Sequence, residues 1–137
     1  MTSTWDHTDR LEPSECMTLL ASARLGRVGW STDEGPQILP VNHAVLDGAI
    51  VFRTDLYSVV ADGTRDSTVA FQADELDDRM TSGWSVLVVG HAEHVDDPKE
   101  MAALFQRMRE PWAPGLRPLV ARIVPAKVTG RRFTREA

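Results

Sequence analysis

The stretch QILPVNHAVLDGAIVFRT, residues 37–54, decides the fold that we expect. Two apolar runs flank the dipeptide Asp47-Gly48. A two-residue hairpin turn of type I′ requires positive φ at both central positions, and Asp followed by Gly tolerates that conformation. The stretch therefore predicts an extended segment over 37–46, a tight turn, and a second strand over 49–54.

Strand patterns continue on both sides of this hairpin. The longest predicted strand covers 84–95, where the β-branched residues Val86, Val88 and Val89 suit a pleated, largely buried surface. Gly90 within it predicts a bulge or a bend. Further strands are predicted at 27–31, 68–74, 119–124 and 127–133.

Two helices are predicted beside the strands. The first is capped by Ser14, carries apolar residues at helical spacing and stops at Gly26. The second begins at the capping-box sequence 97–100 and ends by Pro111. Because the order shows no regular βαβ alternation, we expect a mainly β fold, an antiparallel barrel or sandwich of six or seven strands with two flanking helices. So small a barrel has little interior room, which favours a ligand at its surface or between two copies.

The composition limits the function classes. A length of 137 residues fits one domain, expected over 11–137 after a polar arm at 1–10. A net charge of -5 disfavours general nucleic-acid binding, and the apolar runs are too short to cross a bilayer. The single cysteine, Cys16, cannot form an internal disulfide, which fits a reducing compartment, and we expect a cytoplasmic protein.

The common catalytic motifs for phosphate loops and nucleophile elbows are absent from the sequence. Cys16 lies on the apolar stripe of the first helix, where a packed thiol is expected. His91 and His94 point to opposite faces of a strand, so they favour edge residues over a shared metal site. His91 and Glu93 do share a face, but two ligands without a third make a weak site. The acidic residues at 74–78 indicate a solvated loop.

Three features suit a ligand. Arg53 and Thr54 end a strand just before Ser58, so a guanidinium and two hydroxyls suit a phosphate, or else form an ordinary strand edge. Trp84 follows a flexible turn, where it can face a planar ring or plug the barrel. Trp112 lies in a proline-rich loop that can form a lid or cover the barrel end.

Taken in order, these segments resemble the actinobacterial type of the pyridoxamine 5'-phosphate oxidase-like family, from about Leu11 to Phe133. The matching segments are Leu25-Gly26-Arg27-Val28, Pro40-Val41-Asn42, Val51-Phe52-Arg53-Thr54, Val69-Ala70-Phe71-Gln72, Ser82-Gly83-Trp84-Ser85-Val86 with Val89-Gly90, Pro111-Trp112-Ala113-Pro114-Gly115 and Val128-Thr129-Gly130-Arg131-Arg132.

The resemblance implies a split-barrel homodimer with two flavin mononucleotide (FMN) sites at the subunit interface, each lined by both chains. It implies three groups of cofactor-binding residues: an isoalloxazine-facing group, Val41, Asn42 and His43; a phosphate-binding group, Arg53, Thr54 and Ser58; and a group from elsewhere in the dimer, Gln72, Trp84 and Ser85. The flavin would carry the redox chemistry, and the protein would supply position and electrostatics.

One segment departs from the family pattern. Family members commonly carry a lysine, or an arginine and a lysine, where this chain has Val59 and Val60. Loss of a charge-assisted hydrogen bond to a phosphate costs roughly 1.5–3 kcal/mol, so we expect FMN affinity lower by one to two decades. Arg65 is a candidate substitute. The C-terminal part also lacks the Arg-x-His-type ending of true pyridoxamine phosphate oxidases, which argues against that specific activity.

The sequence leaves three functions open. The first is a flavin-dependent oxidoreductase for a small planar substrate, with a deazaflavin as the alternative cofactor. The second is a non-catalytic barrel that stores or senses flavin, deazaflavin or haem, with His43 and His91 as candidate haem ligands. The third is a structural or partner-binding dimer. Because hydride can reach the exposed face of a flavin ring directly, no catalytic acid or base is named.

Overall fold

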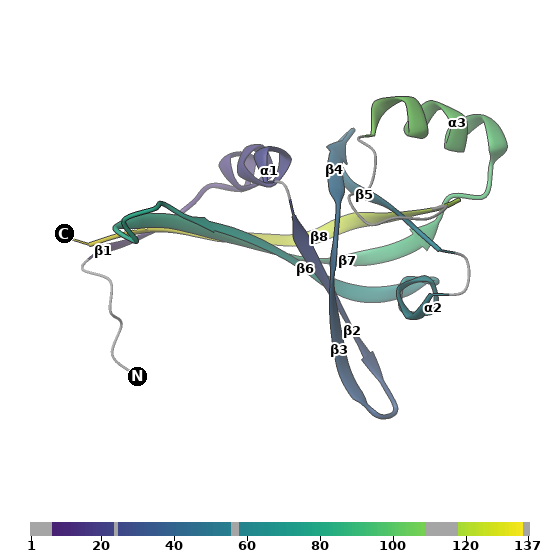
Figure 1. Cartoon of the computed structure of the whole chain (residues 1–137), viewed down its shortest axis with the longest axis horizontal. Coiled ribbons are helices and arrows are strands. Elements are labelled where there is room, and N and C mark those ends of the chain that lie inside the picture. Colours follow the sequence, from purple (N-terminus) through teal and green to yellow (C-terminus); the bar gives the residue numbers. More distant parts are fainter. Residues whose placement is uncertain (1–6, 24, 56–57, 109–117, 136–137) are drawn as a thin grey trace.

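The computed structural model describes residues 7–23, 25–55, 58–108 and 118–135. Within these ranges the chain forms one antiparallel sheet of eight strands with three helices (Figure 1). In chain order the elements are β1 (His7–Arg10), α1 (Pro13–Ser22), β2 (Gly26–Thr32), β3 (Gly35–Val41), β4 (His43–Leu46), β5 (Ala49–Thr54), α2 (Val59–Gly63), β6 (Ser67–Leu76), β7 (Ser82–His94), α3 (Pro98–Arg107) and β8 (Leu119–Thr134).

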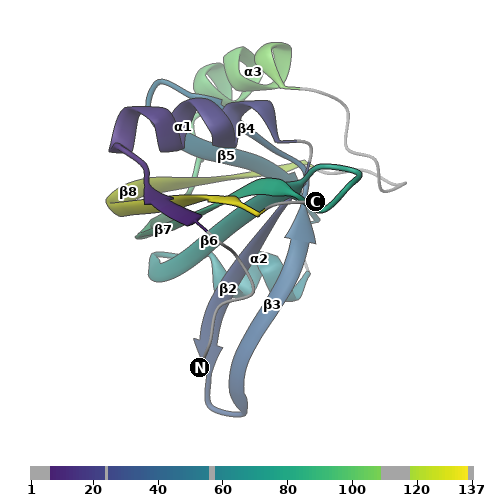
Figure 2. The same cartoon turned by 90° about the vertical axis from the view of Figure 1, so that its left-hand side faces the viewer.

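The sheet curls into a split barrel. Its strand order is β3-β2-β6-β7-β8-β5-β4, with β1 pairing with β8. The two end strands of this order, β3 and β4, are separated in sequence by Asn42 alone. The sheet must therefore bend until its two edges meet at that residue, although no ladder joins β3 to β4 (Figure 2). The predicted mainly β, antiparallel split-barrel class is confirmed.

The local turn and bulge predictions are confirmed. Asp47 and Gly48 both have positive φ, 54° and 78°, as the hairpin turn requires. The β7–β8 ladder shifts register at Gly90: Val89 pairs with Lys127, whereas Gly90 pairs with Pro125. Because the extra residue is absorbed as a bulge, β8 runs on as one strand where the sequence predicts two.

The strand and helix counts exceed the prediction, for different reasons. The strand β1 comes from the polar arm, and all four of its residues are exposed, so no apolar alternation marks it. The short helix α2 lies in a segment expected to be irregular, and Ser58 caps it by accepting a hydrogen bond from Ala61 N at 3.0 Å. The helix α1 begins one residue before the predicted cap, because Pro13 at the first helical position needs no hydrogen-bond acceptor.

The main core lies between α1 and the inner face of the sheet. Cys16 and Leu20 of α1 are fully buried there with Phe71 and Val86. Burial raises the pKa of the Cys16 thiol, as expected for a packed side chain. No helix in the described part of the chain is long and apolar enough to span a membrane.

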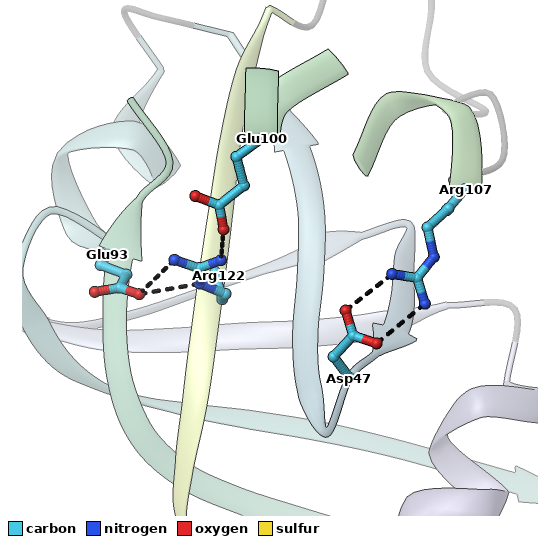
Figure 3. A network of polar contacts seen from close by, with 5 residues as sticks. All are labelled: Asp47, Glu93, Glu100, Arg107 and Arg122. Carbon is cyan, nitrogen blue, oxygen red and sulfur yellow. Dashed lines mark hydrogen bonds and ion pairs between the residues drawn. The ribbon is translucent and has the colours of Figure 1, made fainter. Parts of the chain in front are cut away.

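A second, smaller core lies under α3 on the outer face of the sheet. Leu104 packs there against strand residues that include Val51 and Val120. Two sets of ion pairs then fasten α3 to the strands (Figure 3): Arg122 of β8 contacts Glu93 of β7 and Glu100 of α3, and Arg107 of α3 pairs with Asp47 of the hairpin turn at 2.9 Å. Asp97 caps α3 by accepting from Lys99 N, which confirms the predicted helix start.

Two glycines of β2 provide a matched test of this packing. A Cβ atom at Gly26 would overlap the buried ring of Phe71, whereas a Cβ at Gly29 would meet only Gln37 O, at 3.5 Å. We expect Gly26→Ala to lower the free energy of unfolding by about 1–3 kcal/mol, because the core must shift to admit the methyl group.

The control, Gly29→Ala, should be neutral or slightly stabilising, since it reduces the entropy of the unfolded chain without strain. Urea denaturation of both variants measures the difference. Equal losses would contradict the close approach of Gly26 to Phe71.

Candidate functional site

The end of β5 places two of the predicted phosphate-binding hydroxyls together. Thr54 Oγ1 lies 2.9 Å from Ser58 Oγ, and Ser58 caps α2. Thr54 is only 4 % exposed, so Ser58 is the hydroxyl nearer to solvent. The pair is rigid because Ser58 Oγ also donates to Asp55 O at 2.9 Å.

The third member of this group points another way. Arg53 and Thr54 are neighbours on a strand, so their side chains leave opposite faces of the sheet. The guanidinium of Arg53 lies over the ring of Phe105 in α3, 4.3 Å from its centroid. This cation–π contact fixes the arginine against α3. The structure therefore joins Thr54 to Ser58, and it directs the Arg53 side chain to the opposite, outer face.

The two valines at the positions where a cation was expected differ sharply in exposure to solvent. Val59 is 61 % exposed, whereas Val60 is buried in the main core. A charged side chain at 60 would have to enter that core, while one at 59 would extend into solvent next to Ser58.

The corner between β3 and β4 holds the isoalloxazine-facing group. Val41 and His43 are each 8 % exposed, and Asn42 lies between them. His43 Nε2 donates to Leu20 O at 2.8 Å, and the ring meets Phe71 edge to face. The His43 side chain therefore joins α1 to the corner.

The third predicted group is divided between the two faces of the sheet. Gln72 Nε2 donates to Asp74 Oδ2 at 2.8 Å and to Ser85 Oγ at 3.3 Å, so Gln72 and Ser85 form a polar pair on the outer face. Trp84 is only 7 % exposed and belongs to the main core. The structure thus separates Trp84 from Ser85 and uses the indole to fill the barrel.

The predicted phosphate-binding residues and the Gln72–Ser85 pair lie at opposite ends of the sheet. Arg53 pairs with Val120, and Val95 N donates to Val120 O at 2.9 Å, so the predicted phosphate-binding residues lie beside the end of β7. Ser85 of β7 precedes Val95 by ten residues. At roughly 3.3 Å per residue, the Gln72–Ser85 pair is about 30 Å, measured along the strand, from the predicted phosphate-binding residues Arg53 and Thr54. One copy of the chain therefore keeps these two sets of predicted site residues apart.

The remaining titratable candidates are engaged elsewhere. His91 Nε2 lies 2.7 Å from an Asp66 carboxylate oxygen, and Glu93 pairs with Arg122. His94 Nε2 lies 3.2 Å from Thr64 Oγ1, and burial, together with the charge of Arg65, lowers its pKa. Among the described residues no three potential metal ligands gather. The candidate haem ligands His43 and His91 lie on different faces of the sheet. The predicted Trp112 loop falls outside the described residues.

Sequence reasoning missed one feature of the surface. A groove of about 800 Å³ adjoins Ser85 and is lined by three basic side chains, Arg10, Lys127 and Arg131. Alternation of Lys127, Thr129 and Arg131 along the last predicted strand was a usable signal. Arg10 gave none, because only the pairing of β1 with β8 brings it there.

Comparison with known proteins identifies the relatives of this chain. The family model of pyridoxamine 5'-phosphate oxidase matches residues 12–132. The uncharacterized protein Rv0080 of Mycobacterium tuberculosis is 41% identical over 132 residues, which cover 93% of this chain and 86% of that protein.

Two solved structures agree in fold and sequence. A Corynebacterium glutamicum protein, provisionally assigned as a pyridoxamine 5'-phosphate oxidase, is 34% identical with a TM-score of 0.85, over 98% of this chain and 99% of its own. An FAD binding protein from Mycobacterium smegmatis is 34% identical with a TM-score of 0.77, over 91% of this chain and 98% of its own. The family model covers nearly the whole sheet that carries both sets of residues, and this chain belongs to the pyridoxamine 5'-phosphate oxidase family.

Proposed function

We propose that this chain is a cytoplasmic flavin-dependent oxidoreductase that acts on a small planar substrate as a homodimer, with FMN as the expected cofactor and a deazaflavin as the alternative. Family membership supports a flavin, and the similar Mycobacterium smegmatis protein is an FAD binding protein. The cytoplasmic location rests on the single cysteine, which fits a reducing compartment.

The observation that carries the proposal is the separation of the two half-sites. Arg53, Thr54 and Ser58 offer a cation and hydroxyls at one end of the sheet, and Gln72 with Ser85 offers amide and hydroxyl groups about 30 Å away. A mononucleotide cannot span that distance. A two-fold axis brings each half-site of one copy against the other half-site of its partner, which completes two equivalent sites.

The outer face of the sheet has the apolar surface that such a dimer needs. Ile38 of β3 is 63 % exposed, and it pairs with Gly29, which pairs with Ala70, which pairs with Val89. This row crosses four strands and lines an open apolar depression. Exposed apolar patches on a sheet mark contact surfaces, so a second copy is the occupant that completes both the patch and the site.

The donor set fits a flavin phosphate and ring in a dimer. Ser58, with Thr54 behind it, would donate to the phosphate by turning its hydroxyl away from Asp55 O, and Arg53 would supply charge from its place on Phe105. The corner backbone at 41–43 and the Gln72–Ser85 pair would contact the polar edges of the ring. The bound flavin supplies reversible hydride and electron transfer, and the protein side chains position it and exclude water.

Cofactor binding tests the proposal directly. The purified protein titrated with FMN should show a visible flavin spectrum and quenched flavin fluorescence. In Arg53→Gln, the affinity for FMN should fall about tenfold while that for riboflavin, which has no phosphate, stays unchanged. Arg79→Gln, in the exposed β6–β7 turn, is the control and should leave both affinities as they were.

A colourless protein that binds no flavin at flavin concentrations of tens of micromolar would contradict the proposal. If flavin binds, repeated reduction by a nicotinamide donor and substrate-dependent reoxidation separate an enzyme from a barrel that only stores or senses the cofactor.

The difference between the two valines gives a second test. Val59→Lys should raise FMN affinity by about one to two decades, because a lysine at this exposed position can donate to the phosphate beside Ser58. Val59→Gln, which is similar in length but uncharged, should change the affinity much less. An unchanged affinity in Val59→Lys would place the phosphate elsewhere.

The dimer has its own test. Ile38→Asp puts a charge in the middle of the apolar row, so the sedimentation coefficient should change from that of a dimer to that of a monomer, and FMN affinity should fall with it. Met80→Asp exchanges another exposed apolar residue, 51 % exposed in the β6–β7 turn, and should leave the dimer intact. A wild-type monomer that binds FMN fully would refute the shared site.

A further inference from the structure

The groove beside Ser85 gathers positive charge on an acidic protein. The chain has 20 acidic and 15 basic side chains, yet Arg10, Lys127 and Arg131 all line this one groove. Among the described residues, none of the three forms an ion pair with a carboxylate. Glu12 also lines the groove, which leaves a net charge of two positive units there.

The sheet register explains why these side chains meet. Arg131 pairs with Ser85 on one side and with Arg10 on the other, so a hydroxyl and two guanidinium groups stand in one row across three strands. Lys127 and Arg131 are four residues apart on β8, and side chains at even spacing share a face. The backbone of the strands therefore aims the three cations into the same space.

This arrangement is unfavourable without an anion. Side chains directly opposite on antiparallel strands have Cβ atoms about 5 Å apart, and like charges in such pairs are destabilising. Arg10 and Arg131 form such a pair, and Leu11 N donates to Gly130 O at 2.9 Å, which holds β1 in this register. A bound anion would convert the repulsion into two charge-assisted hydrogen-bond partners.

The rest of the groove suits a ring. Leu87 is 41 % exposed on the face that carries Lys127 and Arg131, and Phe133 also lines the groove. Its volume of about 800 Å³ lies within the range of pockets that bury small organic ligands. An apolar wall beside a cationic row fits a molecule with a planar group at one end and phosphates at the other.

We propose that this groove binds the diphosphate of a nucleotide, with Arg10, Arg131 and Lys127 around the phosphates and the base against Leu87. Two negative charges of a diphosphate diester match the net charge of the groove. The diphosphate can belong to the adenylate half of FAD or to a separate nucleotide ligand. The first source rests on the proposed flavin function, because Ser85, which borders the groove, belongs to the proposed Gln72–Ser85 half-site, and the second source does not.

The binding test uses ADP and inorganic pyrophosphate as probes on the full chain. Both should raise the melting temperature of the wild type, and isothermal titration should give a measurable ADP affinity. Arg131→Gln and Lys127→Gln should each weaken ADP about tenfold or more. The chain's other lysine, Lys99 of α3, gives the control: Lys99→Gln makes the same charge change away from the groove and should leave ADP binding unchanged.

A readout without ligand separates a binding role from a structural one. Because Arg10 and Arg131 repel each other, the ligand-free Arg131→Gln variant should melt at the same temperature as the wild type or higher. A structural arginine would give a lower melting temperature instead.

Affinities for FMN and FAD identify the source of the diphosphate. If FAD binds more tightly than FMN and Arg131→Gln removes the difference, the groove holds the cofactor's own diphosphate. If both flavins bind equally while ADP still binds, or if ADP binds and no flavin does, the groove serves a separate nucleotide. If ADP binds and no flavin does, the proposed flavin function is contradicted, whereas the proposed nucleotide site is supported. The inference is overturned if neither probe binds at millimolar concentration and FAD gains nothing over FMN, or if Lys99→Gln weakens ADP as much as Lys127→Gln does.

Discussion

The link between the two edges of the sheet constrains the rest of the structure. Only Asn42 separates β3 from β4, although these strands stand at opposite ends of the strand order. A flat sheet cannot satisfy so short a connection, so the sheet must curl. The curl encloses a core that α1 closes, and His43 next to the link donates to Leu20 O of that helix. The outer face is left to carry α3, the apolar row and the cationic groove.

The curl also divides the polar groups between two ends of the molecule. The long strands β7 and β8 run between the Arg53 end and the Ser85 end, and they are too long for one small cofactor to touch both. In the proposed dimer, both ends would contribute to one site. The ion pairs of Arg122 and Arg107 fix α3, and with it Phe105 under the Arg53 guanidinium.

Short-range signals in the sequence were reliable where the backbone itself decides. The Asp47-Gly48 turn and the Asp97 cap each depend on a few adjacent residues and form as predicted. Predictions failed where partners far along the chain decide. The strand β1 is polar throughout and exists because β8 pairs with it. The α1 cap is Glu12, two residues before the predicted Ser14, and this difference has a local cause, since Pro13 opens the helix.

The sequence by itself determined the mainly β, antiparallel class, the turns, the family and the residue types at the candidate site, because these follow from local propensity and from motif order. The tertiary structure alone decided what each side chain does. Neighbours in sequence have different environments. Trp84 fills the core while Ser85 faces outward, and Val60 is buried while Val59 is exposed. Arg10 and Arg131 lie far apart in the chain and become a pair. The physical reason is that the face and register of a strand are set by its partners, which no local pattern records.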